Sequence, residues 1–360
     1  MSGAGGLSGP ALITGGAGFI GCNVADRLLA QGQPVRVFDN LSRGSVEKNL
    51  EWLKRRHGAL LDVRVGDVRD RGAVREAVAG ASSVFHFAAQ VAVTTSLEDP
   101  VTDFDVNARG TLHVLEALRE RGEPVPLLFT STNKVYGGLE RVEFVEQGGR
   151  YEPSDELMRE HGVSEAQPLD FHSPYGCSKG SADQYVIDYA RAFGVRAVVF
   201  RMSCIYGPRQ FGTEDQGWVA HFLIRALKGE AINVYGDGKQ VRDVLFVDDL
   251  VDAMLAARDR VDALRGRAFN IGGGPRNTLS LLELLSKIGT LHRAKPEVTF
   301  GGWRTGDHRY YVSDVRAFGR EGGWAPRVSV DEGVERLYRW LSGQHAEEAG
   351  RPGPQTAGAP

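Results

Sequence analysis

The chain has 360 residues, of which 42% are hydrophobic and 25% are charged, and its formal net charge is −3. This is the composition of an ordinary globular protein, and the absence of a sustained basic block argues against nucleic acid as a partner. No apolar run reaches the roughly 18 residues of a membrane span, and the Gly- and Ser-rich start lacks the charged and apolar regions of a secretory signal.

The chain contains three widely spaced cysteines, Cys22, Cys177 and Cys204. An odd number without a metal-ligand pattern predicts free thiols in a reducing compartment, so we expect a cytoplasmic protein with no metal site. Residues 1–10 and the Gly-, Pro- and Ala-rich residues 344–360 are expected to be disordered.

Apolar, strand-like runs alternate with helical patterns from residue 11 to about residue 201. This alternation predicts an α/β fold of the Rossmann type, a doubly wound parallel sheet with helices on both faces. In such sheets ligands bind at the carboxyl ends of the strands, where the strand order reverses. The predicted strands are residues 11–14, 35–38, 62–65, 83–87, 126–130 and 196–200.

A glycine-rich turn follows the first predicted strand. Gly15, Gly18 and Gly21 have the spacing at which a backbone turns tightly and approaches a pyrophosphate, whose charge the next helix N-terminus stabilises. The second strand is followed by Asp39, about 20 residues further on, where a carboxylate binds the adenosine ribose hydroxyls and repels a 2′-phosphate. The pattern predicts NAD as the cofactor, and only the nearby Arg43 favours NADP.

A long connection, residues 137–173, carries several Glu, Asp, Gly and Pro residues and has no clear apolar period. Loops of this length in a compact domain are usually functional or disordered. Because it lies between Thr132 and Tyr175, we interpret it as a flap that shapes a substrate site. Beyond residue 205 the alternation loosens. We therefore expect an NAD-binding domain of residues 11–205 and a smaller α/β lobe, residues 206–343, that mainly binds the substrate.

Tyr175 and Lys179 form a Tyr-x-x-x-Lys pattern, which places a phenol and an ammonium one helical turn apart. A phenol with a pKa near ~10 is a poor base at neutral pH, and a cation beside it favours the phenolate. This pattern is common by chance, but here it follows a dinucleotide fingerprint. Together with Thr132, the two patterns predict a dinucleotide-dependent enzyme with Tyr175 as its base.

Several strings make the chain resemble the extended short-chain dehydrogenase/reductase family of nucleotide-sugar epimerases and dehydratases, over about residues 10–343. The resemblance implies tightly bound NAD and epimerisation through transient oxidation of a sugar carbinol. Longer matches are similar to the 2-epimerase branch that acts on CDP-linked hexoses of the paratose and tyvelose type. The strings are residues 14–21, 131–137, 169–180, 209–211, 215–218 and 238–243.

The resemblance also implies roles for individual residues. Tyr175 would take the hydroxyl proton as hydride passes to the nicotinamide, and Thr132 would hydrogen-bond the same oxygen. Lys179 would hold the nicotinamide ribose and lower the pKa of Tyr175. Besides Tyr175 and Lys179, the implied cofactor-binding residues are Gly15, Gly18, Phe19, Ile20, Asp39, Asn40, Arg43, Asp67, Val68, Phe87, Ala88, Ala89, Gln90 and Asn107.

The implied substrate site lies in both halves of the chain. Arg242 and Arg304 would clamp the diphosphate, since guanidinium groups bind phosphate oxygens through paired hydrogen bonds. Asp307 would accept a hydrogen bond from the nucleotide ribose. His172 either lines the sugar pocket or belongs to the loop structure. The base would be selected around Ala231, Ile232 and Val234, and the remaining contacts are Asn133, Lys134, Cys204, Arg209 and Gln216.

Two positions depart from related enzymes. The 4,6-dehydratases carry an Asp-Glu pair after the catalytic Thr to eliminate water, and Asn133 and Lys134 stand there in this chain, which disfavours dehydration. Cys204 replaces an Asn that contacts the substrate in many relatives, so the exact sugar stays open. The alternatives are a 4-epimerase or dehydrogenase for a UDP- or GDP-sugar, and a non-catalytic NAD-binding regulator. The helical segments 101–121 and 178–193 are long enough to form a four-helix interface in a homodimer.

Overall fold

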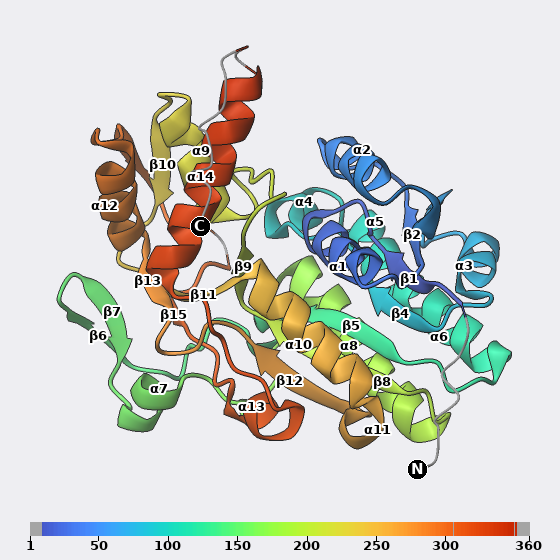
Figure 1. Ribbon diagram of the computed structural model, residues 1–360. Coiled ribbons are helices and arrows are strands. Elements are labelled where there is room, and N and C mark those ends of the chain that lie inside the picture. Colours follow the sequence, from blue (N-terminus) through green and yellow to red (C-terminus); the bar gives the residue numbers. More distant parts are fainter. Residues whose placement is uncertain (1–8, 305, 349, 351–360) are drawn as a thin grey trace.

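The computed structural model describes residues 9–304, 306–348 and 350. Its centre is a seven-stranded sheet of order β12-β8-β5-β4-β1-β2-β3, in which every neighbouring pair is parallel (Figure 1). The predicted fold class is therefore confirmed. The strands are β1 (Ala11–Thr14), β2 (Val35–Asp39), β3 (Leu61–Val65), β4 (Ser83–His86), β5 (Leu127–Thr132), β8 (Ala197–Met202) and β12 (Arg267–Ile271).

Helices cover both faces of the sheet because its strands present apolar side chains to both sides. Ala11 and Ile13 of β1 pack in the core on one face, whereas Leu12 packs in the core on the other. The first face carries α1 (Phe19–Ala30), α2 (Val46–His57), α10 (Val247–Asp259), α11 (Val261–Leu264) and α13 (Arg316–Gly322). The second face carries α3 (Arg71–Val78), α6 (Gly110–Arg121) and α8 (Ser173–Ala192).

The predicted helix at residues 101–121 exists, but its second turn is wider than an α-helix. It consists of α5 (Pro100–Phe104), a π-helical turn η2 (Asp105–Arg109) and α6, preceded by the short α4 (Val93–Glu98). Single π turns inside helices often occur at functional sites. This one holds Asn107 against the loop that follows β4.

A second lobe lies over the carboxyl edge of the sheet (Figure 1). It contains two small sheets, β10 with β14 and β11 with β9, β13 and β15, packed against three helices. Its elements are β9 (Cys204–Tyr206), α9 (Trp218–Leu227), β10 (Ile232–Tyr235), β11 (Val241–Phe246), β13 (Thr278–Ser280), α12 (Leu281–His292), β14 (Val298–Gly301), β15 (Tyr310–Tyr311) and α14 (Val330–Glu348).

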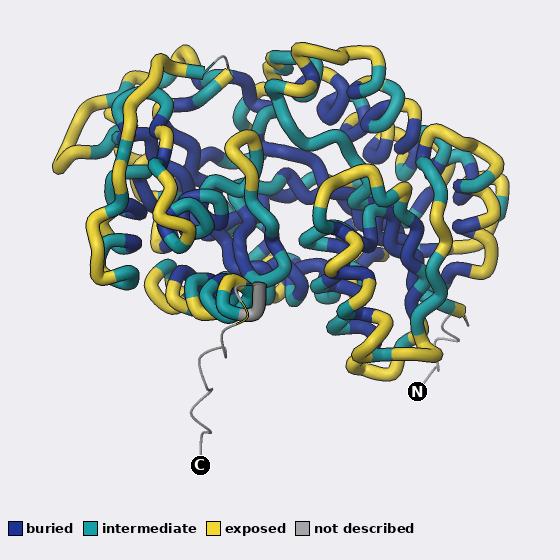
Figure 2. The backbone as a smooth tube through the Cα atoms, turned by 90° about the horizontal axis from the view of Figure 1, so that it is seen from above, coloured by how far each residue is buried: buried dark blue, intermediate teal, exposed yellow. Residues whose placement is uncertain are grey.

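The chain crosses between the two parts after residue 205. Strand β12 returns to the edge of the central sheet beside β8, and α10 packs against α1. Residues 206–343 thus contribute both to the second lobe and to the domain of the central sheet. Helix α14 also continues to Glu348, past the expected end of order at residue 343, while residues 1–8 and 351–360 lie outside the described part. Figure 2 shows the buried residues in the interior of the molecule and the exposed residues at its periphery.

The connection at residues 137–173 has regular structure that its sequence pattern did not reveal. It forms the hairpin β6 (Phe144–Gln147) and β7 (Arg150–Pro153), followed by α7 (Glu156–His161). Gly148 and Gly149 make the hairpin turn with φ of 61° and 80°, a conformation that favours glycine. Strand β7 packs against β11 and β15, so the connection is anchored on the second lobe.

Candidate active site

A cleft of about 910 Å³ lies between the carboxyl ends of β1 to β5 and the second lobe. It sits where the strand order reverses, since β1 lies between β2 and β4. One half is built by the loops after these strands, and the other half by residues 202–222, 233–242 and 304–307. The geometry thus brings the predicted cofactor residues other than Asn107, and most of the predicted substrate residues, into one space.

The glycine turn requires glycine for a local reason. Gly15 has φ +68°, and a Cβ atom there would lie 2.7 Å from the backbone nitrogen of Ala88. Helix α1 begins directly after Gly18, whose position carries no side-chain cap. Its first backbone N–H groups and the positive end of its dipole therefore lie at the cleft, an arrangement that suits a pyrophosphate.

Asp39 ends β2 with its carboxylate in the cleft. The backbone N–H of Ala17 donates to one carboxylate oxygen at 3.0 Å, and that of Leu41 donates to the other at 2.9 Å. Burial raises the pKa of Asp39, and these two hydrogen bonds oppose the rise. Each oxygen keeps a lone pair for a ribose hydroxyl. The exposed Arg43 also lines the cleft.

Asp67 lines the same end of the cleft, but its carboxylate already has partners. Arg69 donates to both oxygens at 2.9 and 2.8 Å, and Asn40 donates to Oδ2 at 2.8 Å. Arg69 holds the pKa of Asp67 well below its usual range. A hydrogen bond from an adenine amine would have to share this carboxylate with Arg69 and Asn40.

The π-helical turn supports the loop after β4. The Asn107 side chain accepts from the backbone N–H of Gln90 at 2.9 Å and donates to the Gln90 carbonyl at 3.1 Å. Asn107 itself does not line the cleft, whereas Phe87, Ala88, Ala89 and Gln90 do. Its predicted role, support of the active-site loop, agrees with this position.

Thr132, Tyr175 and Lys179 converge at the centre of the cleft, Thr132 from the end of β5 and the other two from α8. The Lys179 ammonium donates to the Thr130 carbonyl at 2.7 Å and lies 4.4 Å from the centre of the Phe129 ring. Burial lowers the pKa of Lys179 to about 8.

The pKa of Tyr175 differs from the expectation. Burial raises it to about 12, and a hydrogen bond with Thr132 opposes the rise without cancelling it. Lys179 is not among the groups that lower the pKa of Tyr175, and its ammonium donates to the carbonyl of Thr130. Beside Thr132, the Ser131 hydroxyl is buried without a hydrogen-bond partner among the described residues, so a polar ligand group would satisfy it.

Cationic side chains in the substrate half of the cleft lie beside carboxylate, carbonyl or aromatic groups. Arg242 donates from Nη2 to Asp307 Oδ1 at 2.5 Å, and Lys134 donates to the Gly306 carbonyl at 2.7 Å. Arg304 stacks over the Tyr235 ring with its guanidinium carbon 3.7 Å from the ring centre. Cys204, Arg209, Gln216 and Asn133, which were expected to contact the substrate, also line the cleft.

The predicted pocket for the nucleotide base is wrong, because the side chains that face the cleft lie one position further along the strand. Ile232 and Val234 are buried in the core of the second lobe, and Ala231 precedes the strand, so none of the three lines the cleft. Because side chains alternate along a strand, the cleft receives Asn233 and Tyr235 instead.

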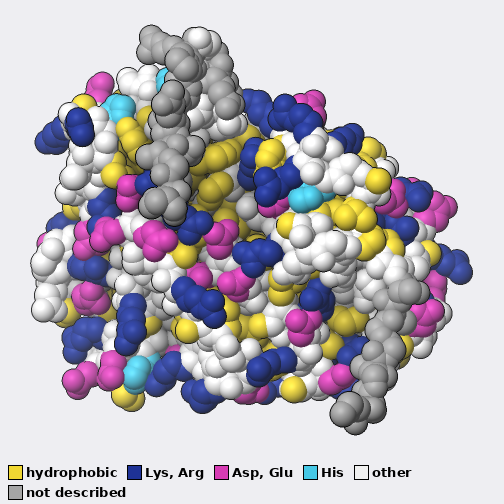
Figure 3. Space-filling model, viewed as in Figure 1, with side chains coloured by type: hydrophobic (Ala, Val, Ile, Leu, Met, Phe, Trp, Pro, Cys, Tyr) yellow, Lys and Arg dark blue, Asp and Glu magenta, His cyan; other side chains and the backbone are white. Residues whose placement is uncertain are grey.

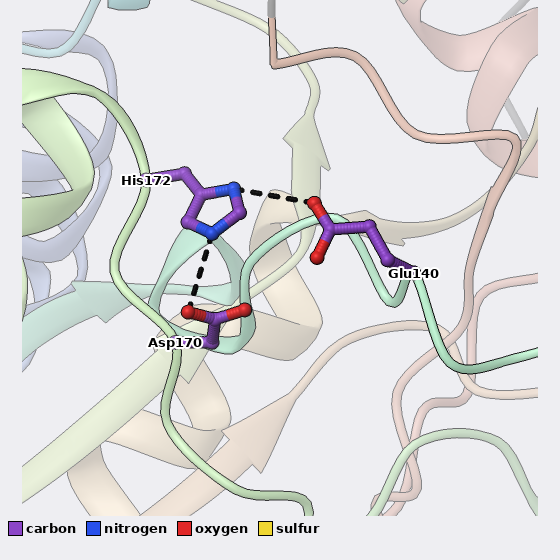
Figure 4. Close-up of side chains that lie close together, drawn as sticks. All are labelled: Glu140, Asp170 and His172. Atoms are coloured by element: carbon purple, nitrogen blue, oxygen red, sulfur yellow. Dashed lines mark ion pairs between the residues drawn. The ribbon is translucent and has the colours of Figure 1, made fainter.

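His172 does not line the cleft, nor does any other residue between 135 and 174. Its imidazole is exposed and lies 3.4 Å from Glu140 and 3.2 Å from Asp170 in ion-pair geometry (Figure 4). His172 thus lies in the loop structure, outside the cleft lining. The interpretation of residues 137–173 as a flap over the substrate is not supported.

Other residues line the cleft that the sequence analysis did not assign to a site. One ends β8, and the others come from α9 and the loop before it, where the strings 209–211 and 215–218 that carry the family resemblance are the signal. They include Met202, Phe211, Glu214, Asp215, Trp218 and His221.

The surface and the thiols agree with the composition. On the face shown in Figure 3, Lys and Arg side chains are interspersed with Asp and Glu over both lobes. Cys22, Cys177 and Cys204 are all free. Among the described residues, no helix has the length and apolar character needed to cross a bilayer.

Together, the reversal-point cleft, the glycine turn, Asp39 and the Thr132, Tyr175 and Lys179 set define a dinucleotide-dependent enzyme of the short-chain dehydrogenase/reductase type. A family model described as NAD dependent epimerase/dehydratase matches residues 11–272. The chain belongs to this family of NAD-dependent enzymes, and its cofactor is NAD.

Curated relatives and solved structures match the chain over almost its whole length. It is 43% identical to CDP-paratose 2-epimerase of Salmonella typhi, over 92% of this chain and 98% of that protein. Its fold is similar to UDP-glucose 4-epimerase of Thermotoga maritima solved with UDP-glucose, with a TM-score of 0.79, 31% identity and coverage of 92% and 98%. UDP-glucose 4-epimerase of Thermus thermophilus in complex with NAD gives a TM-score of 0.77, 32% identity and coverage of 93% and 99%.

Proposed function

We propose that the protein epimerises a nucleotide-linked hexose at C2, with a CDP-sugar of the paratose and tyvelose type as its substrate. The observation that carries the proposal is the 43% identity to CDP-paratose 2-epimerase over 92% of the chain. Such a reaction belongs to the synthesis of activated sugars. Three free thiols suit a reducing compartment such as the cytoplasm.

The arrangement of side chains supports reversible oxidation of a carbinol. When bound, NAD accepts a hydride from the sugar carbon and returns it. Tyr175 Oη would take the proton of the sugar hydroxyl and give it back, while Thr132 Oγ1 holds the same oxygen. Lys179 adds a buried positive charge one turn along α8. Inversion then requires only that the flat keto sugar presents its other face.

The residues after Thr132 favour epimerisation over dehydration. Elimination of water needs a general acid and a general base near the leaving group. Asn133 offers a neutral amide and Lys134 an amine that is hydrogen-bonded to Gly306, and both lie in the cleft. A substrate with its diphosphate near Arg242 and Arg304 would place the sugar beside Thr132 and Tyr175, and the base toward Asn233 and Tyr235.

Two alternative functions can be distinguished from this proposal by experiment. A 4-epimerase for a UDP-sugar is favoured by the likeness to UDP-glucose 4-epimerases. A non-catalytic NAD-binding regulator would have no need of Thr132, Tyr175 and Lys179 in one cleft. NMR analysis of products from CDP-paratose, CDP-tyvelose and a panel of UDP- and GDP-sugars tests the proposal. Conversion of the two CDP-sugars into each other is the expected result. Turnover of only UDP- or GDP-sugars, or of none, would contradict it.

We also propose a homodimer in which α5, α6 and α8 of two copies pack together. The supporting observation is a set of apolar side chains that α5 and α8 leave exposed: Val101 is 70% exposed, and Phe104 and Tyr185 are each 50% exposed. A second copy would cover this face by two-fold symmetry. Sedimentation at micromolar concentration should give twice the monomer mass, and Val101→Glu should lower it to the monomer value. A monomeric mass for the unaltered protein would contradict the proposal.

A further inference from the structure

The end of the cleft around Tyr235 is rich in hydrogen-bond acceptors. Glu214 belongs to the loop between β9 and α9 and lines the cleft there, together with Asn233 and Tyr235 of β10. The Tyr235 hydroxyl donates to Glu214 Oε1 at 2.5 Å. Because a phenol carries a single proton, this hydrogen bond leaves the Tyr235 side chain without a donor for a ligand.

A second hydroxyl in this region is committed in the same way. Thr299 of β14 is the register partner of Asn233 and donates its only hydroxyl proton to Asn233 Oδ1. The Asn233 amide in turn hydrogen-bonds Glu214. The hydrogen bonds from Tyr235 and Asn233 hold the pKa of Glu214 below its usual value, although burial opposes them, so Glu214 is a carboxylate at neutral pH.

Gln240 adds an acceptor beside the backbone of Tyr235. Its Nε2 donates to the Tyr235 carbonyl at 2.6 Å, and this bond sets the orientation of the amide. Its Oε1 is buried without a hydrogen-bond partner among the described residues, and Gln240 lines the cleft. A buried acceptor without a partner costs free energy, so this end of the cleft favours a ligand that brings N–H or O–H donors.

Glu214 keeps acceptor capacity for such a donor. A carboxylate has about four lone-pair positions, and Tyr235 and Asn233 use two of them. Arg304 donates from Nη1 to the backbone carbonyl of Glu214 at 3.0 Å, and its Nη2 lies 3.4 Å from Oε1 in ion-pair geometry. The Glu214 side chain is 43% exposed, so a ligand in the cleft can reach the remaining positions.

We propose that Glu214 selects the nucleobase by accepting a hydrogen bond from an exocyclic amine, so that the site takes cytosine in preference to uracil. Cytosine carries an amine at C4, for which a carboxylate is a matching acceptor. Uracil carries an oxygen at that position, which a carboxylate repels. The inference rests on the proposed function for the place of the base, toward Asn233 and Tyr235, and it adds the residue that decides which base is bound.

Binding of CDP and UDP to the purified protein with its NAD tests this selection without a sugar and without turnover. Calorimetry should give CDP a Kd about 10–100 times lower than that of UDP, the discrimination that one matched base contact supplies. Glu214→Gln removes the charge and adds an amide donor that can meet the uracil oxygen. The preference for CDP should therefore fall by about tenfold in this variant.

Asp215→Asn is the matched control. Asp215 also lines the cleft and lies 3.6 Å from Arg304, but among the described residues its carboxylate makes no hydrogen bond with Tyr235 or Asn233. Its substitution should leave the preference for CDP unchanged. Binding of UDP or GDP by the unaltered protein as tightly as CDP would overturn the proposal. An equal loss of affinity for CDP and UDP in Glu214→Gln would overturn it as well.

The base selection and the proposed reaction can fail separately. A preference for CDP that depends on Glu214, in a protein that does not convert CDP-paratose, would refute the 2-epimerase and support the selection. Conversion of CDP-paratose by a protein that binds CDP and UDP equally would refute the role of Glu214 alone.

Discussion

Lys134 joins the two halves of the active site, because its ammonium donates to the Gly306 carbonyl at 2.7 Å across the cleft. Lys134 follows β5 of the central sheet, and Gly306 belongs to the second lobe. Burial lowers the pKa of Lys134 to about 8, with a further contribution from Arg242. The cleft therefore holds a cation whose charge changes in the pH range in which enzymes are usually assayed.

This charge predicts a pH-dependent affinity for a diphosphate-containing substrate. Because the folded-state pKa lies below the usual value of 10.5, the ammonium is present below about pH 8 and is lost above it. KM should therefore rise by roughly tenfold between pH 7 and pH 9.5, as expected for loss of a charge-assisted hydrogen bond. In Lys134→Met, KM should be high and nearly independent of pH. The exposed Lys54→Met is the control, and a flat KM in the unaltered enzyme would refute the assignment.

Tyr175→Phe tests the base. The substitution keeps the ring and removes the only oxygen that moves the proton, so kcat should fall by on the order of 10²–10⁴. NAD released by denaturing the purified variant should still be near stoichiometric. Tyr185→Phe removes a hydroxyl from the same helix at an exposed position and serves as the control. A Tyr175→Phe enzyme with nearly full turnover would show that another group is the base.

Asp39 should govern both retention and choice of cofactor. In Asp39→Asn the amide keeps the size of the side chain but loses the charge that binds ribose hydroxyls and repels a 2′-phosphate. The NAD content of purified protein should drop by about tenfold on repeated gel filtration, and the relative affinity for NADPH should rise. Quantifying nucleotides in the acid extract checks both effects. Unchanged NAD content would place the adenosine ribose elsewhere.

Neighbouring positions on β10 should separate binding from stability. Asn233 faces the cleft, so Asn233→Ala should raise KM for the sugar nucleotide and leave Tm nearly unchanged. Val234 is buried with 0% exposure, so Val234→Ala should cost about 1–3 kcal/mol of unfolding free energy and leave KM nearly unchanged. Steady-state kinetics and thermal unfolding of the two variants test this prediction. The reverse pattern would mean that Val234, and not Asn233, faces the cleft.

The parts of the site that could be predicted from the sequence are those that depend on a local pattern. Gly15 and Asp39 sit at strand ends that a short apolar run identifies, and the spacing of Tyr175 and Lys179 needs only a helix. Val234 was misplaced because an apolar strand that is short and half-buried does not reveal which of its faces is inward. The place of β12 beside β8 depends on a contact between distant segments, and no local period in the sequence carries that information.

The flap interpretation failed for a related reason. The stretch 137–173 is rich in turn residues, but its few apolar side chains, such as Leu139 and Val163, pack with Tyr136 and Tyr311 of other segments. A small cluster of this kind anchors a hairpin and a short helix on the second lobe. The anchoring partners lie far away in the sequence, so the pattern alone resembled a loop.

The proposed reaction requires that hydride leaves and returns at C2 of a CDP-linked hexose. Single turnover and steady-state reactions with CDP-paratose deuterated at C2 test it most directly. We predict a primary isotope effect on kcat and a CDP-tyvelose product that keeps its deuterium at C2, because the transferred hydride never exchanges with water. Loss of the label to solvent would indicate proton abstraction next to a carbonyl. An isotope effect only with substrate labelled at C4 would place the chemistry at C4, and either result would contradict hydride transfer at C2.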